Sequence, residues 1–433
     1  MSFSRCLFLC MGLGFGSAHA VTNIIVDSDS GAYNITGACV LRDAITFANS
    51  GTPTGGCSAQ GTTTSAPTIG VNSYTIELPQ AATITLTEVD NVTNNAGLPA
   101  ITAVVTIDGN GSVIQRDPQL GCNGNGVTDP GEFRLLYNAN VLILNEVTLR
   151  GGCADSANDL LADGGAINSV GSLTLNNVVL SDNYASNRGG ALYALGFSSS
   201  DAINDSTFRD NTAPAGAGLF FQGTTSSLHV ERSLFLHNSS AYGAGASIAE
   251  NATAVFINST FSNNTAGKAS AIAADGLVTL VSSTVAGNDG TALHISTAGG
   301  PGQKATIKNS LFSANTGSFG NCYFGVQSNV ALLGVNLSSD DSCAGFAMMN
   351  TDAKLSPLAD NGGLTLTYAL EANSPAIDAV LDCTDADGVV LDRDQRWHLR
   401  PQDSTGQVPV RCDIGAFERD DKLFGDNFEP IIQ

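Results

Sequence analysis

The chain has 433 residues, of which 42% are hydrophobic, so it is long enough to bury a large core or to form two or three domains. Its 40 acidic and 18 basic residues give a formal net charge of −22, which argues against nucleic acid as a partner because phosphate binding requires a cationic surface. The same charge disfavours acidic polysaccharides unless a cation bridges the two. The 48 glycines and the low share of charged residues, 13%, favour many short strands joined by turns in one elongated body.

The N-terminus has the pattern of a signal peptide. Arg5 provides a short basic region, residues 6–15 form an apolar run, and Ala18-His19-Ala20 has the form of a cleavage site. The apolar run is too short to span a bilayer, and no other segment has an unbroken apolar run of membrane length. We expect cleavage after Ala20 rather than lipidation of Cys10, because bulky residues precede that cysteine. The mature chain is therefore predicted to be exported, to the cell surface, the medium or the periplasm, without a transmembrane segment.

Cleavage would remove Cys6 and Cys10 and leave eight of the ten cysteines. An even number of cysteines in an exported chain indicates disulfides. The eight fall into four local pairs, which we expect to be bonded: Cys39–Cys57, Cys122–Cys153, Cys322–Cys343 and Cys383–Cys412. A metal cluster is the alternative, but the chain has no C-x-x-C motif and no histidine at ligand spacing.

The segment after the signal peptide is expected to cover the open end of the fold. Within residues 38–49, Leu41, Ala44, Ile45 and Ala48 keep helical spacing, and a short amphipathic helix there would shield an otherwise bare core. Alternating apolar residues then predict irregular early strands, with an insertion around residues 122–132. These strands are expected at residues 74–78, 82–86, 104–108, 133–136 and 141–149.

Two short motifs alternate between Gly164 and Asn315. The first is a Gly/Ala-rich quartet ending in an aliphatic residue, as in Gly164-Gly165-Ala166-Ile167, and the second is Ser-x-apolar-x-x-Asn. Successive copies of the second motif start about 26 residues apart, and self-similarity at such a period indicates a solenoid. Its closing asparagines, including that of a degenerate first copy, are Asn183, Asn211, Asn238, Asn264, Asn288 and Asn315.

Alternation of apolar and small polar residues within each repeat favours strands over helices. A repeat of this length accommodates three short strands and three turns, and stacked coils form parallel sheets at about 4.8 Å per coil. We expect one aliphatic or aromatic column to face inward and the asparagines to hydrogen-bond in a ladder at a corner. The Gly-rich quartet suits a tight bend. The inward column is predicted to contain Leu192, Phe208, Leu219, Phe235, Phe261, Ile272 and Phe312.

Three parts of the chain resemble known modules. The quartets, paired with Phe-x-x-Asn at Phe208–Asn211 and its later copies, resemble the repeats of chlamydial polymorphic outer-membrane proteins. Residues 39–45 resemble the N-terminal Cys-Ser-Leu-Arg-Glu-Ala module of exported bacterial proteins, with Val40 and Asp43 as departures. Four blocks near the other end resemble a choice-of-anchor module: Ser374–Asp378, Asp394–Arg396, Arg400-Pro401 and Cys412–Glu418.

The resemblance implies an all-β, right-handed parallel β-helix of the pectin-lyase type, exported, with a short helical cap and a C-terminal cap module. The domains are then expected at 1–20 for the signal peptide, 21–60 for the N-terminal cap, 61–345 for the β-helix (clear repeats 164–315) and 346–433 for the C-terminal module. The tail after Glu418 has no apolar helix and no basic stop, so free secretion is as compatible with the sequence as surface attachment.

The pectin-lyase fold hosts polysaccharide lyases and hydrolases, so catalytic residues must be sought separately. A lyase needs a cationic base near the substrate, but the repeats contain few cations. Two of them are Arg209 and Arg232. These arginines could form a polar patch with Asp182, Asp205 and Asp210, or all five residues could belong to solvated turns. A hydrolase needs paired carboxylates. Asp182 and Asp210, one coil apart, are the catalytic candidates, and neither has a supporting histidine motif.

Two oxygen-rich turns are candidates for a structural calcium ion, the only cofactor that we consider. One contains Asp382, Asp385 and Asp387, and the other runs from Asn123 through Asn125 and Asp129 to Glu132. We judge that neither turn matches the twelve-residue EF-hand loop. Asp394, Arg396, Arg400 and Asp413 are expected to form salt bridges within the C-terminal module instead.

Regular repeats without a catalytic constellation favour a non-catalytic exported β-helix that binds a carbohydrate or the surface of a host or neighbouring cell. The alternatives are a polysaccharide lyase or glycoside hydrolase of the same fold and a structural component of the envelope that has no ligand.

Overall fold

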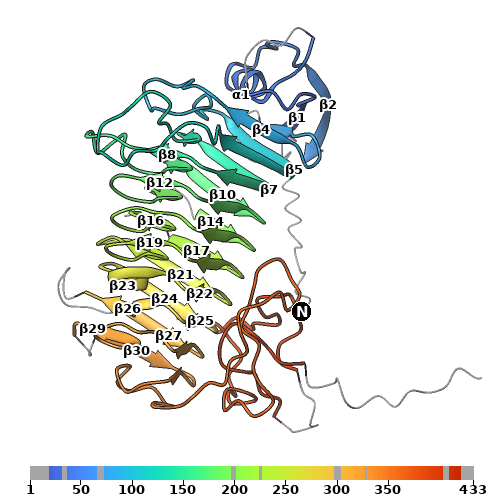
Figure 1. Ribbon diagram of the computed structural model, residues 1–433. Coiled ribbons are helices and arrows are strands. Elements are labelled where there is room, and N and C mark those ends of the chain that lie inside the picture. Colours follow the sequence, from blue (N-terminus) through green and yellow to red (C-terminus); the bar gives the residue numbers. More distant parts are fainter. Residues whose placement is uncertain are drawn as a thin grey trace, which may run out of the picture.

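The computed structural model describes residues 19–31, 37–65, 73–196, 201–223, 227–296, 304–326, 329–402 and 409–420. The chain winds into an all-β parallel β-helix whose coils stack from the N-terminal to the C-terminal end (Figure 1). The predicted signal peptide lies outside the described residues except for its last two, which begin the first strand. Among the described residues, no helix is both long and apolar enough to cross a membrane.

Each regular coil contributes one strand to each of three faces. Face 1 consists of β1 (His19–Ile25), β3 (Ser73–Glu77), the first halves of β5 (Val104–Arg116) and β7 (Val141–Arg150), β10 (Ser172–Asn176), β14 (Asp201–Asn204), β17 (Ser227–Glu231), β21 (Thr253–Ile257), β24 (Leu277–Val281), β27 (Ala305–Lys308) and β30 (Val330–Leu333). Face 2 consists of β4 (Thr83–Leu86), the second halves of β5 and β7, β11 (Val179–Ser181), β15 (Thr207–Arg209), β18 (Leu234–Leu236), β22 (Thr260–Ser262), β25 (Thr284–Ala286), β28 (Leu311–Ser313) and β31 (Leu337–Ser338).

Face 3 consists of β6 (Leu136–Asn138), β9 (Ile167–Ser169), β13 (Leu192–Ala194), β16 (Leu219–Phe221), β20 (Ala246–Ile248), β23 (Thr265–Ala274), β26 (Asp289–Ile295) and β29 (Cys322–Phe324). Short strands outside the faces are β2 (Ala59–Ser65), antiparallel to β1, the pair β8 (Cys153–Ala154) and β12 (Tyr184–Ala185), and β19 (Ser239–Ser240), which pairs with β23.

The predicted core and ladder are both present. Every residue of the predicted inward column is at most 1% exposed, and Phe208, Phe235 and Phe261 stack in register with centroid distances of 4.8 and 4.5 Å. The closing asparagines lie in one row, buried except at Asn315, in which each Nδ2 donates to the Oδ1 of the next, from Asn183 to Asn315, at 2.9–3.0 Å. Repetition of the same residue in each coil therefore produces a continuous chain of amide hydrogen bonds.

The corners depend on residues in the left-handed backbone region. Gly164, Gly189, Gly216 and Gly243, the first residues of the quartets, have φ of 59–71°, and a Cβ on Gly164 would approach the carbonyl oxygen of Ile167 to 2.3 Å. The tight bend predicted for the quartet is thus confirmed, and its glycine is required by both backbone conformation and space.

The helix predicted for residues 38–49 is α1 (Leu41–Ser50). Leu41, Ala44, Ile45 and Ala48 are at most 2% exposed and join the core of the first coil. The αL residue Gly51 ends the helix by donating its N–H to the carbonyl of Phe47. The four predicted cysteine pairs are disulfides in the structure.

The C-terminal segment does more than cover the end of the last coil, the position that we expected for a cap. It folds back along the side of the coils and lies over face 2 and the corner between faces 1 and 2 (Figure 1). Its own small core includes Ala353, Leu370, Ile414 and Phe417. The reason is that its polar groups bind corner residues of several coils, from Asp205 to Asn309.

Of the salt bridges expected in this segment, Arg396 pairs with Asp394 at 2.7 Å, whereas Arg400 pairs with Glu418 at 2.9 Å. Asp413 accepts hydrogen bonds from the backbone N–H groups of Asp378 and Arg419 instead of pairing with an arginine. The expectation was therefore wrong for Asp413, because its position in the turn directs its oxygens to backbone donors.

One carboxylate interrupts the apolar core. Asp201 is 2% exposed; Oδ1 accepts the Leu173 N–H at 2.9 Å, and Oδ2 has no hydrogen-bond partner among the described residues. Burial raises the pKa of Asp201 to about 6. Because the folded-state pKa is raised, the stability linked to this group is complete below the unfolded-state pKa of about 4 and is lost as pH rises through about 6.

We expect Asp201→Asn to remove this loss. The difference in free energy of unfolding between the variant and the parent protein should grow in favour of the variant by up to about 3 kcal/mol from about pH 4 to about pH 8. Urea unfolding at the two pH values measures it. An identical difference between variant and parent at both pH values would contradict the prediction.

Candidate functional site

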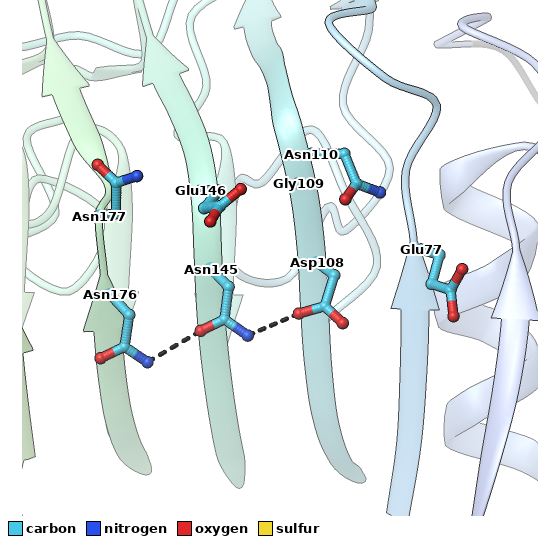
Figure 2. Close-up of a pocket in the computed structure, with 8 residues that line it drawn as sticks. All are labelled: Glu77, Asp108, Gly109, Asn110, Asn145, Glu146, Asn176 and Asn177. Atoms are coloured by element: carbon cyan, nitrogen blue, oxygen red, sulfur yellow. Dashed lines mark hydrogen bonds between the residues drawn. The ribbon is translucent and has the colours of Figure 1, made fainter.

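A row of polar side chains follows the outer edge of face 1. Asp108, Asn145, Asn176 and Asn204 close four successive strands of this face and stand in register. Asn145 donates to Asp108 at 2.6 Å and Asn176 to Asn145 at 2.9 Å (Figure 2). Asn204 donates to Asn176 at 2.9 Å. Outside the core, the protein thus has a second amide ladder, which is half-buried.

A second row of side chains lies at the adjoining corner between faces 1 and 2 (Figure 2). Asn110, Glu146 and Asn177 occupy the corner with φ of 50–53°, so the chain turns sharply after each ladder residue. Together with Glu77, the two rows enclose a hollow of about 390 Å³, which we call the corner groove. Gly109 lies in its floor, where a Cβ would meet the carbonyl oxygen of Glu146 at 2.5 Å.

The corner groove offers hydrogen bonds and negative charge. Its carboxylates are Glu77, Asp108 and Glu146, and no lysine or arginine is among its lining residues. Each ladder asparagine uses one N–H towards its neighbour, so a second N–H remains for a ligand. Donors and acceptors are therefore presented at the spacing of the coils, about 4.8 Å.

An aromatic residue lies at the same corner one coil beyond the groove. Asp205 occupies the same corner position in the coil after Asn177, and its carboxylate accepts the indole N–H of Trp397 at 2.8 Å. The guanidinium of Arg232 lies 3.9 Å from the centroid of the Trp397 ring. Trp397 itself is 49% exposed. The C-terminal segment thus covers this corner from Trp397 onward and leaves the earlier coils open.

The catalytic candidates Asp182 and Asp210 lie at a different corner, directly after face 2. They are exposed, take equivalent places in successive coils and have φ of 58°. Asp210 contacts Arg209 at 2.8 Å and His237 at 3.6 Å. The left-handed backbone explains aspartate at both positions, and their surroundings include no enclosed space among the described pockets.

The polar patch proposed around Arg209 and Arg232 is not formed as one surface. Arg209 points outward at the end of β15, whereas Arg232 occupies the corner between faces 1 and 2 and binds Asp205 at 2.9 Å. The two arginines are in successive coils but at different positions, because Arg209 pairs with Leu236 of the next coil, whereas Arg232 follows Asp205 in the corner row.

The first calcium candidate already contains a cation. The Lys308 ammonium donates to Asp382 at 2.9 Å, to the Thr384 hydroxyl at 2.8 Å and to the Asp385 carbonyl at 2.9 Å. Hydrogen bonds from Thr384 and Lys308 lower the pKa of Asp382. The Asp385 carboxylate caps the backbone N–H groups of Asp387 and Val389. Lys308 therefore binds where a metal ion would compete for the same oxygens.

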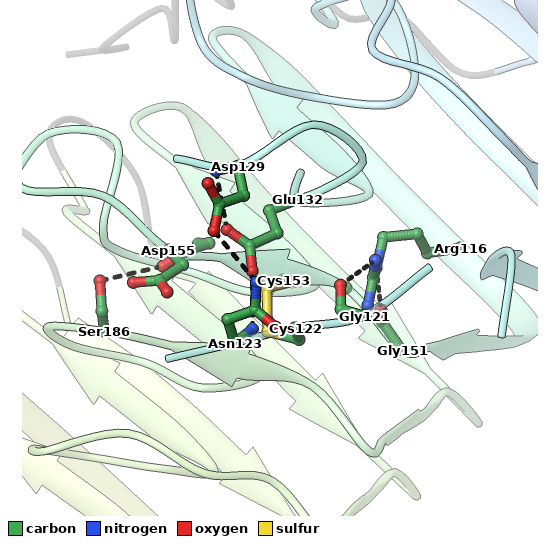
Figure 3. Close-up of a disulfide and its surroundings, with 12 residues drawn as sticks. Arg116, Gly121, Cys122, Asn123, Asp129, Glu132, Gly151, Cys153, Asp155 and Ser186 are labelled. Carbon is green, nitrogen blue, oxygen red and sulfur yellow. Dashed lines mark hydrogen bonds between the residues drawn. A yellow bond between two sulfur atoms is a disulfide. The ribbon is translucent and has the colours of Figure 1, made fainter. Parts of the chain in front are cut away.

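The second candidate is a loop closed by a disulfide and by Arg116 (Figure 3). Arg116 donates to the carbonyls of Gly121 and Gly131 at 2.9 and 2.8 Å, which holds the two ends of the loop together. Counted from Gly121, Asn123, Asn125, Gly126, Asp129 and Glu132 occupy positions 3, 5, 6, 9 and 12 of an EF-hand loop. Gly121 stands at position 1, where an EF-hand has its first aspartate, so the loop matches that pattern only in part.

A carboxylate from elsewhere lies against the loop. Asp155, which follows β8, accepts the N–H groups of Asn125 and Gly126 at 2.8 and 3.0 Å. The Cys122–Cys153 disulfide brings the two segments together. Glu132 and Asp155 are at most 1% exposed, and no salt bridge to either is found among the described residues.

The sequence reading missed the corner groove, although a signal was present. The pairs Asn145-Glu146, Asn176-Asn177 and Asn204-Asp205 end successive strands of face 1, and the last two stand directly before the Ser-x-apolar-x-x-Asn segments. The sequence prediction used only the buried asparagines, because the same residue recurs in every coil, whereas the outer row changes between Asp and Asn.

Comparison with protein families supports the parallel β-helix. The model of the family described as right-handed β-helix region matches residues 135–273. The crystal structure of pectate lyase Pel9A is similar at 15% identity and a TM-score of 0.40, over 80% of this chain and 88% of that chain. No curated protein matches the chain.

Proposed function

We propose that the protein is an exported, non-catalytic β-helix that binds a carbohydrate chain along the corner groove. The observation that carries this proposal is the outer ladder Asp108–Asn145–Asn176–Asn204, which offers free amide groups at regular intervals beside an open hollow. An extended chain of sugar hydroxyls requires such a repeated series of donors and acceptors. Trp397, which binds Asp205 one coil beyond the hollow, would provide an aromatic surface for a chain that extends past it.

Polysaccharide cleavage is the alternative. A lyase requires a cationic base beside the substrate, and the lining of the corner groove has none. A hydrolase requires two carboxyl groups with separate roles as acid and as base or nucleophile, whereas Asp108 is bound by Asn145 and Glu146 is an exposed corner residue. The groove therefore favours binding, and a negatively charged polysaccharide would bind only through a bridging cation.

We expect Asn176→Ala to weaken binding of a neutral polysaccharide about tenfold, because the variant removes ladder contacts from the middle of the groove. Trp397→Ala should produce a similar loss. Isothermal titration of the purified protein against a panel of soluble neutral polysaccharides measures both effects.

The matched control is Asp182→Ala, an exposed corner residue outside the groove, which should bind like the parent protein. If neither groove variant changes the affinity, the carbohydrate binds elsewhere. If the panel shows no binding at all, a structural role in the envelope becomes the better interpretation.

We propose further that a structural calcium ion binds the loop Gly121–Glu132, with Asp155 replacing the missing first aspartate. The oxygens of Asn123, Asn125, Asp129 and Glu132 lie at EF-hand positions. A bound cation would offset the charge of the buried Glu132 and Asp155 carboxylates. The carboxylates now accept hydrogen bonds from N–H groups, so binding requires a local rearrangement of the loop.

Calcium at about 100 times its dissociation constant should stabilise the protein by about 3 kcal/mol, by mass action on the folded state. We expect the melting temperature to rise with calcium in the parent protein and in the control Asp385→Asn, but not in Glu132→Gln. A rise of equal size in Glu132→Gln would show that the ion binds elsewhere.

The finer assignments are also proposals. Residues 39–45 and the four blocks between Ser374 and Glu418 support membership of the Cys-Ser-Leu-Arg-Glu-Ala and choice-of-anchor modules. The four disulfides support export, because disulfides persist in oxidising compartments. Mass spectrometry of the mature N-terminus, expected at Val21, tests the cleavage site.

A further inference from the structure

Four successive coils on the outer side of face 3 carry three aromatic rings and, between two of them, one gap. Tyr137, Asn168, Tyr193 and Phe220 occupy the same outward position in four successive coils. Tyr193 and Phe220 stack with centroids 5.7 Å apart and ring planes 20° apart. Asn168 stands where the pattern would place another ring, between the two tyrosines, and its short side chain leaves space above it.

That space is a hollow of about 300 Å³. Leu160 and Leu161 form one wall, and the fully buried Arg134 holds their carbonyls with Nη2 at 3.4 and 2.8 Å. Tyr193 is fixed on the opposite side by a 3.1 Å hydrogen bond from its hydroxyl to Gln222 and by the guanidinium of Arg188 at 4.9 Å. The hollow is thus maintained by contacts that do not involve a ligand.

Asn168, one of the residues that line the hollow, has a buried acceptor without a partner among the described residues. Asn168 is only 4% exposed; its Nδ2 donates to the Asp163 carbonyl at 3.3 Å, whereas its Oδ1 has no hydrogen-bond partner among the described residues. The orientation of the amide follows from the carbonyl that Nδ2 faces. A buried acceptor without a partner is unfavourable, and a ligand that donates a hydroxyl to Oδ1 would remove this cost.

The charges around the hollow favour a neutral ligand. Asp163 lines it, but its side chain is 1% exposed and is bound by Arg188 at 2.7 Å. No lysine or arginine lines the hollow to neutralise an acidic sugar. Thr93, Asn94 and Asn158 add polar groups to the lining. Aromatic walls with a few polar groups are the usual composition of a small-ligand site.

We propose that this hollow is a second binding site that takes one neutral pyranose residue. The apolar face of the sugar ring would pack against a tyrosine of the interrupted column, and one hydroxyl would donate to Asn168 Oδ1. The site lies on a different face from the corner groove and shares no residue with it. It can therefore bind even if the groove does not.

The test uses methyl pyranosides of glucose, galactose, mannose and N-acetylglucosamine as probes, with saturation-transfer NMR and titration of the full chain. We expect at least one to bind at millimolar concentration. Asn168→Leu, which keeps the volume and removes the acceptor, should weaken binding about tenfold, and Asn168→Tyr, which supplies the missing ring, should abolish it. Both variants should keep the melting temperature of the parent protein within a few degrees, and Ser247→Ala, two coils beyond Tyr193 in the same column, should bind normally.

Three results would overturn the proposal. The first is that no methyl pyranoside binds, and the second is that the folded Asn168→Leu and Asn168→Tyr variants bind as tightly as the parent protein. The third is preferential binding of galacturonic acid or of N-acetyltyrosinamide. The last outcome would assign the hollow to an acidic sugar or to an aromatic side chain of a protein partner. Groove variants such as Asn176→Ala should leave pyranoside binding unchanged, so failure of this site and failure of the corner groove are separately visible.

Discussion

Asn238→Ala is expected to lower the free energy of unfolding by about 4 kcal/mol. The side chain of Asn238 is completely buried. Its Nδ2 donates to the Phe208 carbonyl and to Asn264 Oδ1, both at 2.9 Å, and its Oδ1 accepts from the backbone and side chain of Asn211. Alanine would leave buried groups without these partners on the two neighbouring coils, where water cannot replace the lost partner.

Urea unfolding followed by circular dichroism measures this loss. The matched control is Asn176→Ala, which also interrupts an amide ladder, but a half-buried one on the outer surface. Because solvent can hydrate its neighbours, we expect a loss of only about 1 kcal/mol. Equal effects of the two substitutions would contradict the assignment of the inner ladder as the stabilising one.

Arg400→Met is expected to detach the C-terminal segment from the coils at a cost of about 3–5 kcal/mol. Arg400 is 3% exposed and donates to Glu418 at 2.9 Å, to Asn258 at 2.8 Å and to the Gly415 carbonyl at 2.8 Å. Without the guanidinium, Glu418 would be a buried carboxylate without a cationic partner beside Asp413. The pKa of Asp413 is raised to about 7, first by burial and then by Glu418.

The single tryptophan of the chain is a local probe for this change, because Trp397 packs on Arg232 of the coils. Its fluorescence should respond to urea earlier in Arg400→Met than in the parent protein. Burial also raises the pKa of Glu418, so the deficit should shrink as pH falls and the two carboxyl groups bind protons. Arg209→Met, which breaks an exposed ion pair, should leave the transition unchanged; a deficit independent of pH would contradict the electrostatic explanation.

The features that could be predicted from the sequence are those that recur once per coil. The inner asparagines, the stacked phenylalanines and the quartet glycines repeat because each coil has the same neighbours, so identity and period together indicate their place. The disulfides could be paired because each links cysteines that are near in sequence. Helical spacing at Leu41, Ala44, Ile45 and Ala48 likewise located the end-covering helix.

The functional surfaces were harder to predict because they depend on contacts between distant segments. Trp397 meets Asp205 across 192 residues, and Lys308 reaches Asp382 across 74. Asp155 comes to the loop that we propose as a calcium site from outside its twelve residues, so a linear motif misses it. The gap at Asn168 becomes visible only when the outward residues of successive coils are aligned, since no local pattern marks it.

The central claim is that the corner groove binds a polysaccharide without cleaving it. The most direct measurement incubates the purified mature protein with the polysaccharide that it binds most tightly and follows new reducing ends and the absorbance of unsaturated sugars. We predict saturable binding that depends on Asn176, with neither product above the level of a protein-free control. Product formation that is abolished by Asp182→Ala or by Asp210→Ala would contradict the claim and assign the protein to the polysaccharide-cleaving enzymes.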